Sequence, residues 1–331
     1  MRPKISVLIL FIILCLNCLT FVSLNDTSKA EDPVTYYVDD DNTAGPWDGS
    51  TAHPYRYIQD AIGVASPGER IQVLAGTYSE NLIIRSNKTS IDLFGEDKST
   101  TIITGGGSGD VLTISATGVD VSDFTIKSSG TGSTNAAIKI NASDSVIVNN
   151  IISNSKYGFY IYNCSNTKIY YNSITTNSRE GIYIMNSDYN NITYSTITSS
   201  SYNGIFLYDC SYNTIDNCQI TSNNRNGIYL NATCDYNTIT NNYIVDNSRN
   251  GIYLNDHCEN NDIKYQNGNN KIYSNSDSGI RLENSSLNDL EYNIVDDNSE
   301  YGIMVLGENN SIHNSTISSN NKHGLLSLIH I

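Results

Sequence analysis

A glycine recurs along most of the chain at a nearly constant interval, and this repeat limits the fold more than any other feature. The recurring residues are Gly158, Gly181, Gly204, Gly227, Gly251, Gly279, Gly302 and Gly324. The successive intervals are 23, 23, 23, 24, 28, 23 and 22 residues, and alternating apolar residues follow most of these glycines. A fixed period of this length indicates one supersecondary unit that is stacked on copies of itself.

Each repeat contains three short apolar segments. An aliphatic residue lies seven positions before the glycine, at Ile151, Ile174, Ile197, Ile220, Ile244, Ile272, Val295 and Ile317. A second lies five positions earlier in most copies, at Val146, Ile169, Ile192, Ile215, Ile239, Leu290 and Ile312. The third segment follows the glycine, as where Ile182 and Ile184 flank Tyr183. Alternation of period two predicts strands. Strands this short must pair between stacked repeats, which predicts three parallel sheets.

Asparagines form two columns in the aligned repeats. The first column lies two positions before the second aliphatic position (that of Ile192 and Ile215), at Asn190, Asn213, Asn237, Asn261, Asn288 and Asn310. The second lies four positions before the glycine, at Asn154, Asn177, Asn223, Asn247, Asn275, Asn298 and Asn320, with Ser200 as the exception. Asparagine tolerates left-handed backbone in tight turns, and stacked amides can form hydrogen-bonded ladders. We therefore interpret both columns as structural.

The leucine-rich repeat is the main alternative for a period of this length. That repeat needs a Leu-x-x-Leu-x-Leu pattern and a second half that can be helical. The repeats of this chain contain Ile, Tyr, Asn, Ser and Thr throughout, without a stretch of helical period. The sequence therefore predicts an all-β parallel β-helix of about eleven coils of about 23 residues each.

The repeat columns Asn-x-Ile, Ile-x-x-Asn and Gly-Ile-Tyr-Leu resemble the right-handed, single-stranded parallel β-helices of the pectin-lyase-like superfamily. More narrowly, they resemble the NosD-type domain of prokaryotic envelope and secreted proteins, many of them archaeal. The opening stretch is similar too, with Tyr36-Tyr37-Val38-Asp39-Asp40 and later Gly76-Thr77-Tyr78. The resemblance covers residues 36 to the C-terminus and implies the fold. It does not imply one activity, because this scaffold carries lyases, hydrolases, epimerases and inert modules.

The two ends of the chain differ from the repeats. Arg2 and Lys4 precede an apolar run over residues 5–22, which predicts a signal peptide, or alternatively a retained membrane anchor, within residues 1–30. Residues 31–69 are expected to form an N-terminal cap, with a short helix over 55–65, and residues 70–331 the repeat domain. The sequence stops partway through a repeat without a polar cap. A truncated product, a further C-terminal domain or a capping partner would each account for this end.

The composition restricts the partners. The formal net charge is -15, with 19 Lys and Arg against 34 Asp and Glu. So few basic residues exclude a nucleic-acid-binding footprint. The expected location is extracellular or in the cell envelope, and the expected partner is a polysaccharide or envelope glycan.

A column of cysteines is the first candidate site. Cys164, Cys210, Cys234 and Cys258 share one position of the repeat, which Ser187, Ser285 and Gly307 fill elsewhere. The NosD resemblance implies a link to copper, so Cys210, Cys234 and Cys258 could form a thiolate ladder for Cu(I). A disulfide between neighbouring coils is a second alternative. We favour a third interpretation, in which a tight turn admits only small side chains, and we expect no metal or cofactor.

Acidic residues do not form the catalytic cluster that the resemblance would imply for a hydrolase or lyase. The candidates are Asp39-Asp40-Asp41, Asp256-His257 and Asp296-Asp297. They do not share a column on adjacent repeats, and the Asn-Thr-Asp, Gly-His-Gly and Arg-Ile-Lys motifs of polygalacturonase-like enzymes do not occur. We therefore predict no catalytic residues and interpret these acids as solvated turn residues.

A surface stripe is the candidate that we favour. The outward position two residues after the glycine holds Tyr160, Tyr183, Phe206, Tyr229 and Tyr253. The position two residues before the glycine holds Lys156, Arg179, Arg225, Arg249 and Lys322. Aromatic rings can stack on sugars and arginine can pair with carboxylates, although aromatic residues are also common in sheets. The sequence thus predicts a non-catalytic glycan-binding protein. The alternatives are a divergent lyase, hydrolase or epimerase, and a NosD-like accessory protein in copper delivery.

Overall fold

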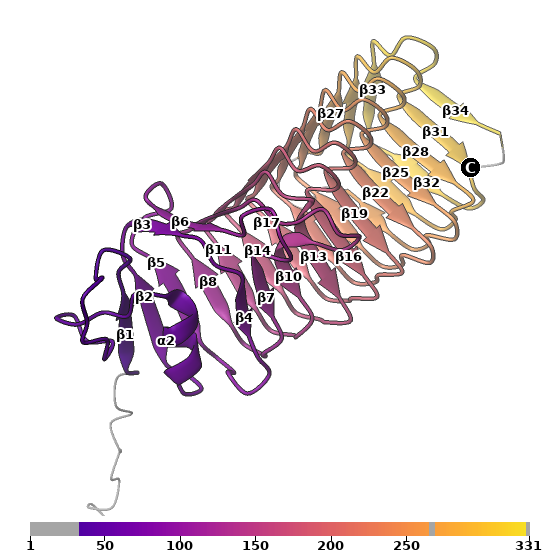
Figure 1. Cartoon of the computed structure of the whole chain (residues 1–331). Coiled ribbons are helices and arrows are strands. Elements are labelled where there is room, and N and C mark those ends of the chain that lie inside the picture. Colours follow the sequence, from indigo (N-terminus) through magenta and orange to yellow (C-terminus); the bar gives the residue numbers. More distant parts are fainter. Residues whose placement is uncertain (1–32, 265–268, 329–331) are drawn as a thin grey trace, which may run out of the picture. The chain divides into compact units, whose positions relative to one another are not determined.

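The computed structural model describes residues 33–264 and 269–328. The predicted signal segment 1–30 lies outside the described residues. Residues from Thr35 onward belong to one compact unit, and the following description concerns that unit (Figure 1).

Three parallel sheets make up this unit, and each coil contributes one strand to each sheet in turn. Sheet 1 consists of β1 (Thr35–Val38), β2 (Arg70–Val73), β5 (Asp92–Gly95), β8 (Asp120–Ser122), β11 (Val146–Val148), β14 (Lys168–Tyr170), β17 (Asn191–Thr193), β20 (Thr214–Asp216), β23 (Thr238–Thr240), β26 (Asp262–Ile263), β29 (Asp289–Glu291) and β32 (Ser311–His313). Sheet 2 consists of β3 (Gly76–Tyr78), β6 (Thr101–Thr104), β9 (Thr125–Lys127), β12 (Ile151–Ser153), β15 (Ser173–Thr175), β18 (Thr196–Thr198), β21 (Gln219–Thr221), β24 (Tyr243–Val245), β27 (Lys271–Tyr273), β30 (Ile294–Asp296) and β33 (Thr316–Ser318). Sheet 3 consists of β4 (Leu82–Ile84), β7 (Leu112–Ile114), β10 (Ala136–Ile140), β13 (Tyr157–Tyr162), β16 (Ile182–Met185), β19 (Ile205–Tyr208), β22 (Ile228–Asn231), β25 (Ile252–Asn255), β28 (Ile280–Glu283), β31 (Ile303–Leu306) and β34 (Leu325–Ser327). The predicted parallel β-helix of about eleven coils is confirmed.

The core consists of aliphatic side chains that stack from coil to coil. Ile192 pairs with Ile215 in sheet 1, and Ile197 pairs with Ile220 in sheet 2. These four side chains are buried. Each buried isoleucine contributes roughly 1.5–3 kcal/mol relative to an exposed one, so the repeated columns supply most of the driving force for stacking.

The register of one repeat differs from the sequence alignment. The alignment on Gly158 places Ile151 and Val146 in the aliphatic columns, whereas the structure pairs Ile152 with Ile174 and Ile147 with Ile169. Ser155, not Asn154, likewise occupies the position in the ladder that precedes Asn177. The main-chain N–H of Ser155 donates to Asn177 Oδ1 at 3.2 Å. This coil is one residue shorter before its glycine. The inward face is decided by pairing with the next coil, because a slip of one residue reverses every side chain.

The recurring glycine marks a close approach between coils. A Cβ added at Gly227 would lie 2.6 Å from Ile244 Cγ2 and 2.7 Å from the carbonyl oxygen of Gly251. Any side chain at this position would therefore displace either the core or the next coil.

Asparagine ladders connect the coils at the corners. The main-chain N–H and the Nδ2 of Asn213 both donate to Oδ1 of Asn237, at 2.9 and 3.1 Å. Asn213 Oδ1 in turn accepts from the main-chain N–H and the Nδ2 of Asn190, at 2.9 and 3.0 Å. The buried amides thus satisfy one another and the turn backbone, as buried polar groups must.

A short helix, α2 (Ile58–Val64), covers the first coils, within the region where the sequence predicts a capping helix. Its buried residues Ile58, Ala61 and Ile62 pack onto the strands below. The carboxylate of Glu80 accepts the N–H groups of Ile58 and Gln59 at 2.9 and 3.0 Å, which satisfies the start of the helix. Among the described residues, no helix is long and apolar enough to cross a bilayer.

Candidate functional site

An aromatic column runs along the outer face of sheet 3. It consists of Tyr160, Tyr183, Phe206, Tyr229 and Tyr253, which are paired in register on β13, β16, β19, β22 and β25. The residues on either side, such as Ile182 and Ile184, are fully buried. The alternation along each strand therefore directs one ring per coil to the outside.

The rings of the aromatic column pack against one another, tilted by 53° and 43° on either side of Tyr183 and stacked from Phe206 to Tyr253. Successive ring centroids lie 5.2, 5.1, 4.8 and 5.0 Å apart. The planes of Phe206 and Tyr229 differ by 14°, and those of Tyr229 and Tyr253 by 15°. Phe206, Tyr229 and Tyr253 thus cover each other's faces, so a ligand outside the sheet would meet mainly ring edges and hydroxyl groups there. Tyr160 is only 8% exposed.

An ion pair ends the aromatic column at β28. The Tyr253 hydroxyl donates to Glu283 Oε2 at 2.6 Å, and Arg281 Nη2 donates to the same oxygen at 2.7 Å. The hydrogen bond from Tyr253 lowers the pKa of Glu283, and Arg281 adds to this effect. Burial raises the pKa of Tyr253, and the hydrogen bond to Glu283 adds to that rise.

A cationic column lies beside the aromatic one. It consists of Arg179, Arg225 and Arg249, with Tyr202 at the corresponding place of the intervening coil. The guanidinium carbons of Arg179 and Arg225 lie 4.0 and 4.2 Å from the centroid of the Tyr202 ring. Arg179 also lies 3.4 Å from Glu180 Oε2. In the described part of the chain, Arg225 and Arg249 form no ion pair.

A further ladder of side-chain hydrogen bonds lies next to the cationic column, at the position that directly follows it in each repeat. Glu180 is 3% exposed, and its Oε1 accepts from Asn203 Nδ2 at 3.4 Å. Asn226 Nδ2 donates to Asn203 Oδ1, and Asn250 Nδ2 donates to Asn226 Oδ1, each at 3.0 Å. Each of these residues directly precedes a recurring glycine, so the ladder holds the backbone that carries the arginines.

Titratable side chains gather at the other end of the aromatic column. Lys139 Nζ lies 3.0 Å from Asp110 Oδ2, and both side chains are 15% exposed. Lys139 also donates to Thr134 Oγ1 at 3.1 Å and lies 5.5 Å from the centroid of the Tyr160 ring. Burial raises the pKa of Tyr160, so its hydroxyl stays protonated at neutral pH.

The cysteine column lies inside the coils. Cys210, Cys234 and Cys258 are buried, and the described cysteines form no disulfide. The Cys234 thiol donates to the carbonyl oxygens of Leu207 and Asn231, at 3.5 and 3.3 Å. Burial raises the pKa of Cys210, and contact with Cys234 raises that of Cys258. The covered thiols pack as small core side chains, as the packing interpretation expects.

The structure does not bring the three acidic sequence candidates together. Asp40 lines a small cavity of about 230 Å³ near the N-terminal cap, with Arg56 and Glu80. Asp256 and His257 lie at a corner with positive φ angles of 59° and 61°. Asp296 accepts a hydrogen bond from Ser318 Oγ at 2.8 Å.

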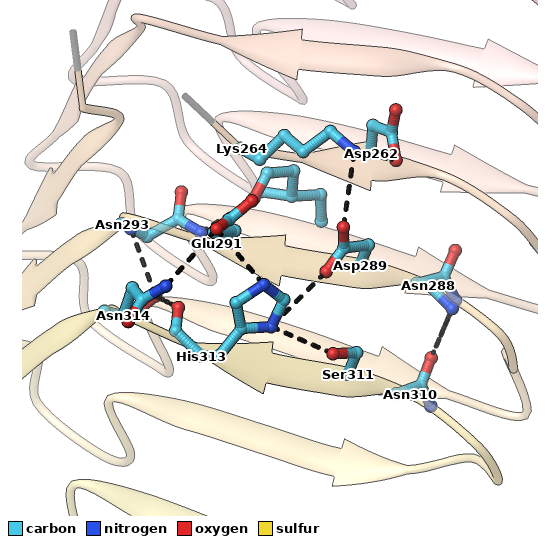
Figure 2. A network of polar contacts seen from close by, with 12 residues as sticks. Asp262, Lys264, Asn288, Asp289, Glu291, Asn293, Asn310, Ser311, His313 and Asn314 are labelled. Atoms are coloured by element: carbon cyan, nitrogen blue, oxygen red, sulfur yellow. Dashed lines mark hydrogen bonds and ion pairs between the residues drawn. The ribbon is translucent and has the colours of Figure 1, made fainter. Parts of the chain in front are cut away.

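Sequence reasoning missed a polar cluster on the outer face of sheet 1 (Figure 2). Asp289 and Glu291 of β29 face His313 of β32, and Glu291 is in register with His313. The separation of Glu291 and His313 by 22 residues was the available signal, because it equals one repeat.

Exposed tyrosines at one corner were also missed. Tyr189, Tyr212 and Tyr236 have φ angles of 56–58°, where bulky side chains are uncommon. Their ring centroids lie 5.0 and 5.1 Å apart, and their planes differ by 6° and 5°. The regular spacing of these tyrosines was visible in the sequence. They were missed because left-handed turn backbone was expected only at asparagine.

Comparison with known proteins agrees with this architecture. The family described as "Right handed beta helix region" matches residues 71–187, 136–268 and 267–328. No curated protein sequence matches the chain. Among solved structures, the A-module of the Azotobacter vinelandii mannuronan C-5 epimerase AlgE4 is 16% identical, with a TM-score of 0.61 over 89% of this chain and 97% of the module.

Two viral structures are similar as well. The Dettilon tailspike protein is 15% identical, with a TM-score of 0.66 over 86% of this chain and 62% of the tailspike chain. ORF18 of Geobacillus virus E2 is 17% identical, with a TM-score of 0.56 over 87% of this chain and 60% of that chain. At these identities the similarity concerns the fold alone. The family match covers most of the sequence, and the chain therefore belongs to the right-handed β-helix family.

Proposed function

We propose that this is an exported, non-catalytic protein of the cell surface or extracellular space, and that it binds an anionic polysaccharide along sheet 3. The observation that carries the proposal is the presence of Arg225 and Arg249 beside the aromatic column, neither of them in a close ion pair among the described residues, although Arg249 interacts electrostatically with Asp277 of the next coil. In a chain with a formal net charge of -15, guanidinium groups that no carboxylate holds in a close ion pair stay available to an external anion. They are suited to bidentate pairing with carboxylate or sulfate groups.

The spacing of the two columns suits a linear polymer. Successive coils present equivalent groups about every 4.8 Å, which is close to the length of one sugar residue in an extended chain. Ring edges and tyrosine hydroxyls would contact the sugar hydroxyls, while the arginines pair with the acidic groups. Salt screens the more distant acids beyond about 8–10 Å, whereas Glu180 and Asp277 lie close to Arg179 and Arg249 and reduce the local positive charge.

The similar structures support this ligand class indirectly. The AlgE4 A-module is named for mannuronan, which is a polymer of uronic acid. A β-helix of similar fold thus acts on an anionic polysaccharide. Export rests on the apolar segment within residues 1–30 and on the resemblance to NosD-type envelope proteins, which we also propose as the nearer relatives.

A second candidate function, catalysis on the bound polysaccharide, is favoured by one observation. Asp110, Lys139 and Tyr160 meet at the end of the aromatic column. Tyr160 would act there as a proton donor, since a tyrosine hydroxyl is protonated at neutral pH. An unsaturated product or an inverted uronic acid after incubation with a polyuronate would establish this activity. The copper-delivery alternative has less support, because it requires accessible thiolates.

Retention of the full chain on polyuronate and sulfated-glycan matrices tests the proposal. We expect wild-type protein to be retained at low salt and released as salt increases. The double variant Arg225→Gln, Arg249→Gln should lose retention. Lys168→Gln is the matched control, because Lys168 is an exposed cation on sheet 1. Equal retention of the double variant, or no retention of the wild type, would contradict the proposal.

A further inference from the structure

The polar cluster on sheet 1 combines groups that bind metal ions. The register of β29 and β32 places His313 beside Glu291, and Asp289 lies two residues earlier on the same face. One ligand atom from each of Asp289, Glu291 and His313 lies within 4.8 Å of the other two. Zinc ligands lie about 2.0–2.2 Å from the ion, so small side-chain rotations would let all three contact one ion.

Hydrogen bonds already hold these side chains on one face (Figure 2). His313 Nε2 lies 3.2 Å from Glu291 Oε1, and His313 Nδ1 lies 3.0 Å from Ser311 Oγ. Asn314 Nδ2 donates to Glu291 Oε1 at 3.3 Å. Such outer contacts orient metal ligands in known sites.

One buried carboxylate oxygen of the cluster, Asp289 Oδ1, has no hydrogen-bond partner. Lys264 Nζ donates to Asp289 Oδ2 at 3.2 Å, but Asp289 Oδ1 is buried and accepts no hydrogen bond. His313 Nδ1 lies 3.7 Å from this oxygen, which is too far for a hydrogen bond. A buried carboxylate oxygen without a partner is costly, and Asp289 Oδ1 faces the imidazole that would share the ion.

The charge balance of the cluster also favours a dication. Lys264 contacts both Asp262 and Asp289, at 3.0 and 3.2 Å. With Glu291, three carboxylates stand against one ammonium group. When His313 is neutral, as a metal ligand must be, two negative charges remain uncompensated. One divalent ion would neutralise them.

We propose that Asp289, Glu291 and His313 form a binding site for one divalent transition-metal ion, for which Zn²⁺ is the suitable probe. An imidazole and two carboxylates match the ligand preferences of zinc and its neighbours. The ligands come from two successive coils, so the ion would link β32 of the last described coil to β29. The site lies on sheet 1 and is independent of glycan binding on sheet 3.

Metal binding is measured on the full chain without an affinity tag, after chelator treatment and removal of the chelator. Isothermal titration with Zn²⁺ should show one site per chain, and Co²⁺ should give the visible absorption of an ion with protein ligands. The melting temperature should rise with added Zn²⁺, because an ion that binds only the folded state stabilises it.

Two histidine variants decide between this site and non-specific binding. His313→Gln should weaken Zn²⁺ binding by at least the roughly 10- to 100-fold that loss of a supporting partner costs. His323→Gln is the matched control, because His323 lies on the last described coil outside the cluster. Circular dichroism shows whether both variants fold. The proposal is overturned if the wild type binds no zinc, or if folded His313→Gln binds it as tightly as the control.

Discussion

Asn237 donates twice to a single atom of Asn261, the residue in the same place of the next coil. Its main-chain N–H and its Nδ2 reach Asn261 Oδ1 at 2.8 and 3.0 Å. Asn237 Oδ1 in turn accepts both donors of Asn213, and Asn237 Nδ2 also donates to the carbonyl oxygen of Cys210. One side chain thus connects three successive coils, because it bonds groups on the preceding and the following coil.

Replacement of Asn237 by alanine should therefore destabilise the protein strongly. Each buried group left without a partner costs about 1–3 kcal/mol, and the main-chain N–H of Asn213 and the carbonyl oxygen of Cys210 both lose theirs. Asn191→Ala is the control, because Asn191 is exposed on β17. Free energies of unfolding from urea titrations measure the difference. Equal losses in the two variants would show that the ladder contributes little to stability.

Replacement of Cys234 tests the packing interpretation of the cysteine column. Cys234→Ser should preserve stability, since Ser187 and Ser285 already fill this place on other coils and donate to main-chain carbonyls at 2.8 and 3.0 Å. Cys234→Leu should cost about 1–3 kcal/mol through overpacking. Stoichiometric copper in wild-type protein purified without oxygen, and its loss in Cys234→Ser, would instead support the thiolate ladder.

The close packing of the rings along the aromatic column predicts that hydroxyl groups, more than ring faces, contact a glycan on sheet 3. The double variant Tyr183→Phe, Tyr229→Phe keeps the stack and removes two hydroxyls. If each hydroxyl makes one hydrogen bond worth about 0.5–1.5 kcal/mol, affinity for a polyuronate should fall roughly tenfold or more. The melting temperature should change little. Unchanged affinity would remove these hydroxyls from the binding surface.

The ion pair at β28 predicts a pH dependence of stability. The pKa of Glu283 lies below its usual 4.5 because Tyr253 and then Arg281 stabilise the carboxylate. A lowered folded-state pKa gives stability that is present above the unfolded-state value and is lost as the pH falls through the folded-state value. Glu283→Gln should thus flatten the loss of stability below about pH 4.5, as followed by urea midpoints.

Glu308→Gln serves as the control for the acid titration. Glu308 is exposed and forms no ion pair among the residues that the structure describes. Its variant should follow the wild-type curve. Identical acid profiles for all three proteins would mean that Glu283 does not contribute.

The fold was predictable because inward and outward positions alternate within every repeat. The alternation around Ile192 and Ile215 can be recognised from the sequence alone. The recurring glycines, where a Cβ would not fit, likewise mark the length of the repeat. The alignment assigned the wrong inward residue at Ile151, because it counted positions from the glycine. Pairing with the next coil decides the register, and it places Ile152 opposite Ile174.

The candidate sites were less predictable, because they depend on side-chain pairs between coils. Tyr202 interrupts the arginine column in the sequence, whereas the structure places the ring between the guanidinium groups of Arg179 and Arg225. Glu291 and His313 lie in the same column of successive repeats. A search for chemical complementarity along columns, rather than for identical residues, would have found them.

The two kinds of asparagine ladder have opposite electrical polarity. In the ladder of Asn213, each side-chain oxygen accepts from the preceding coil and the amide nitrogen donates to the next, whereas Asn226 donates back to Asn203. Backbone dipoles largely cancel in a sheet, so these aligned side-chain amides give each column a positive and a negative end. Glu180 accepts from Asn203 at the positive end of its column. Its negative charge therefore stabilises a row of side-chain dipoles, as an acidic residue does at the start of a helix.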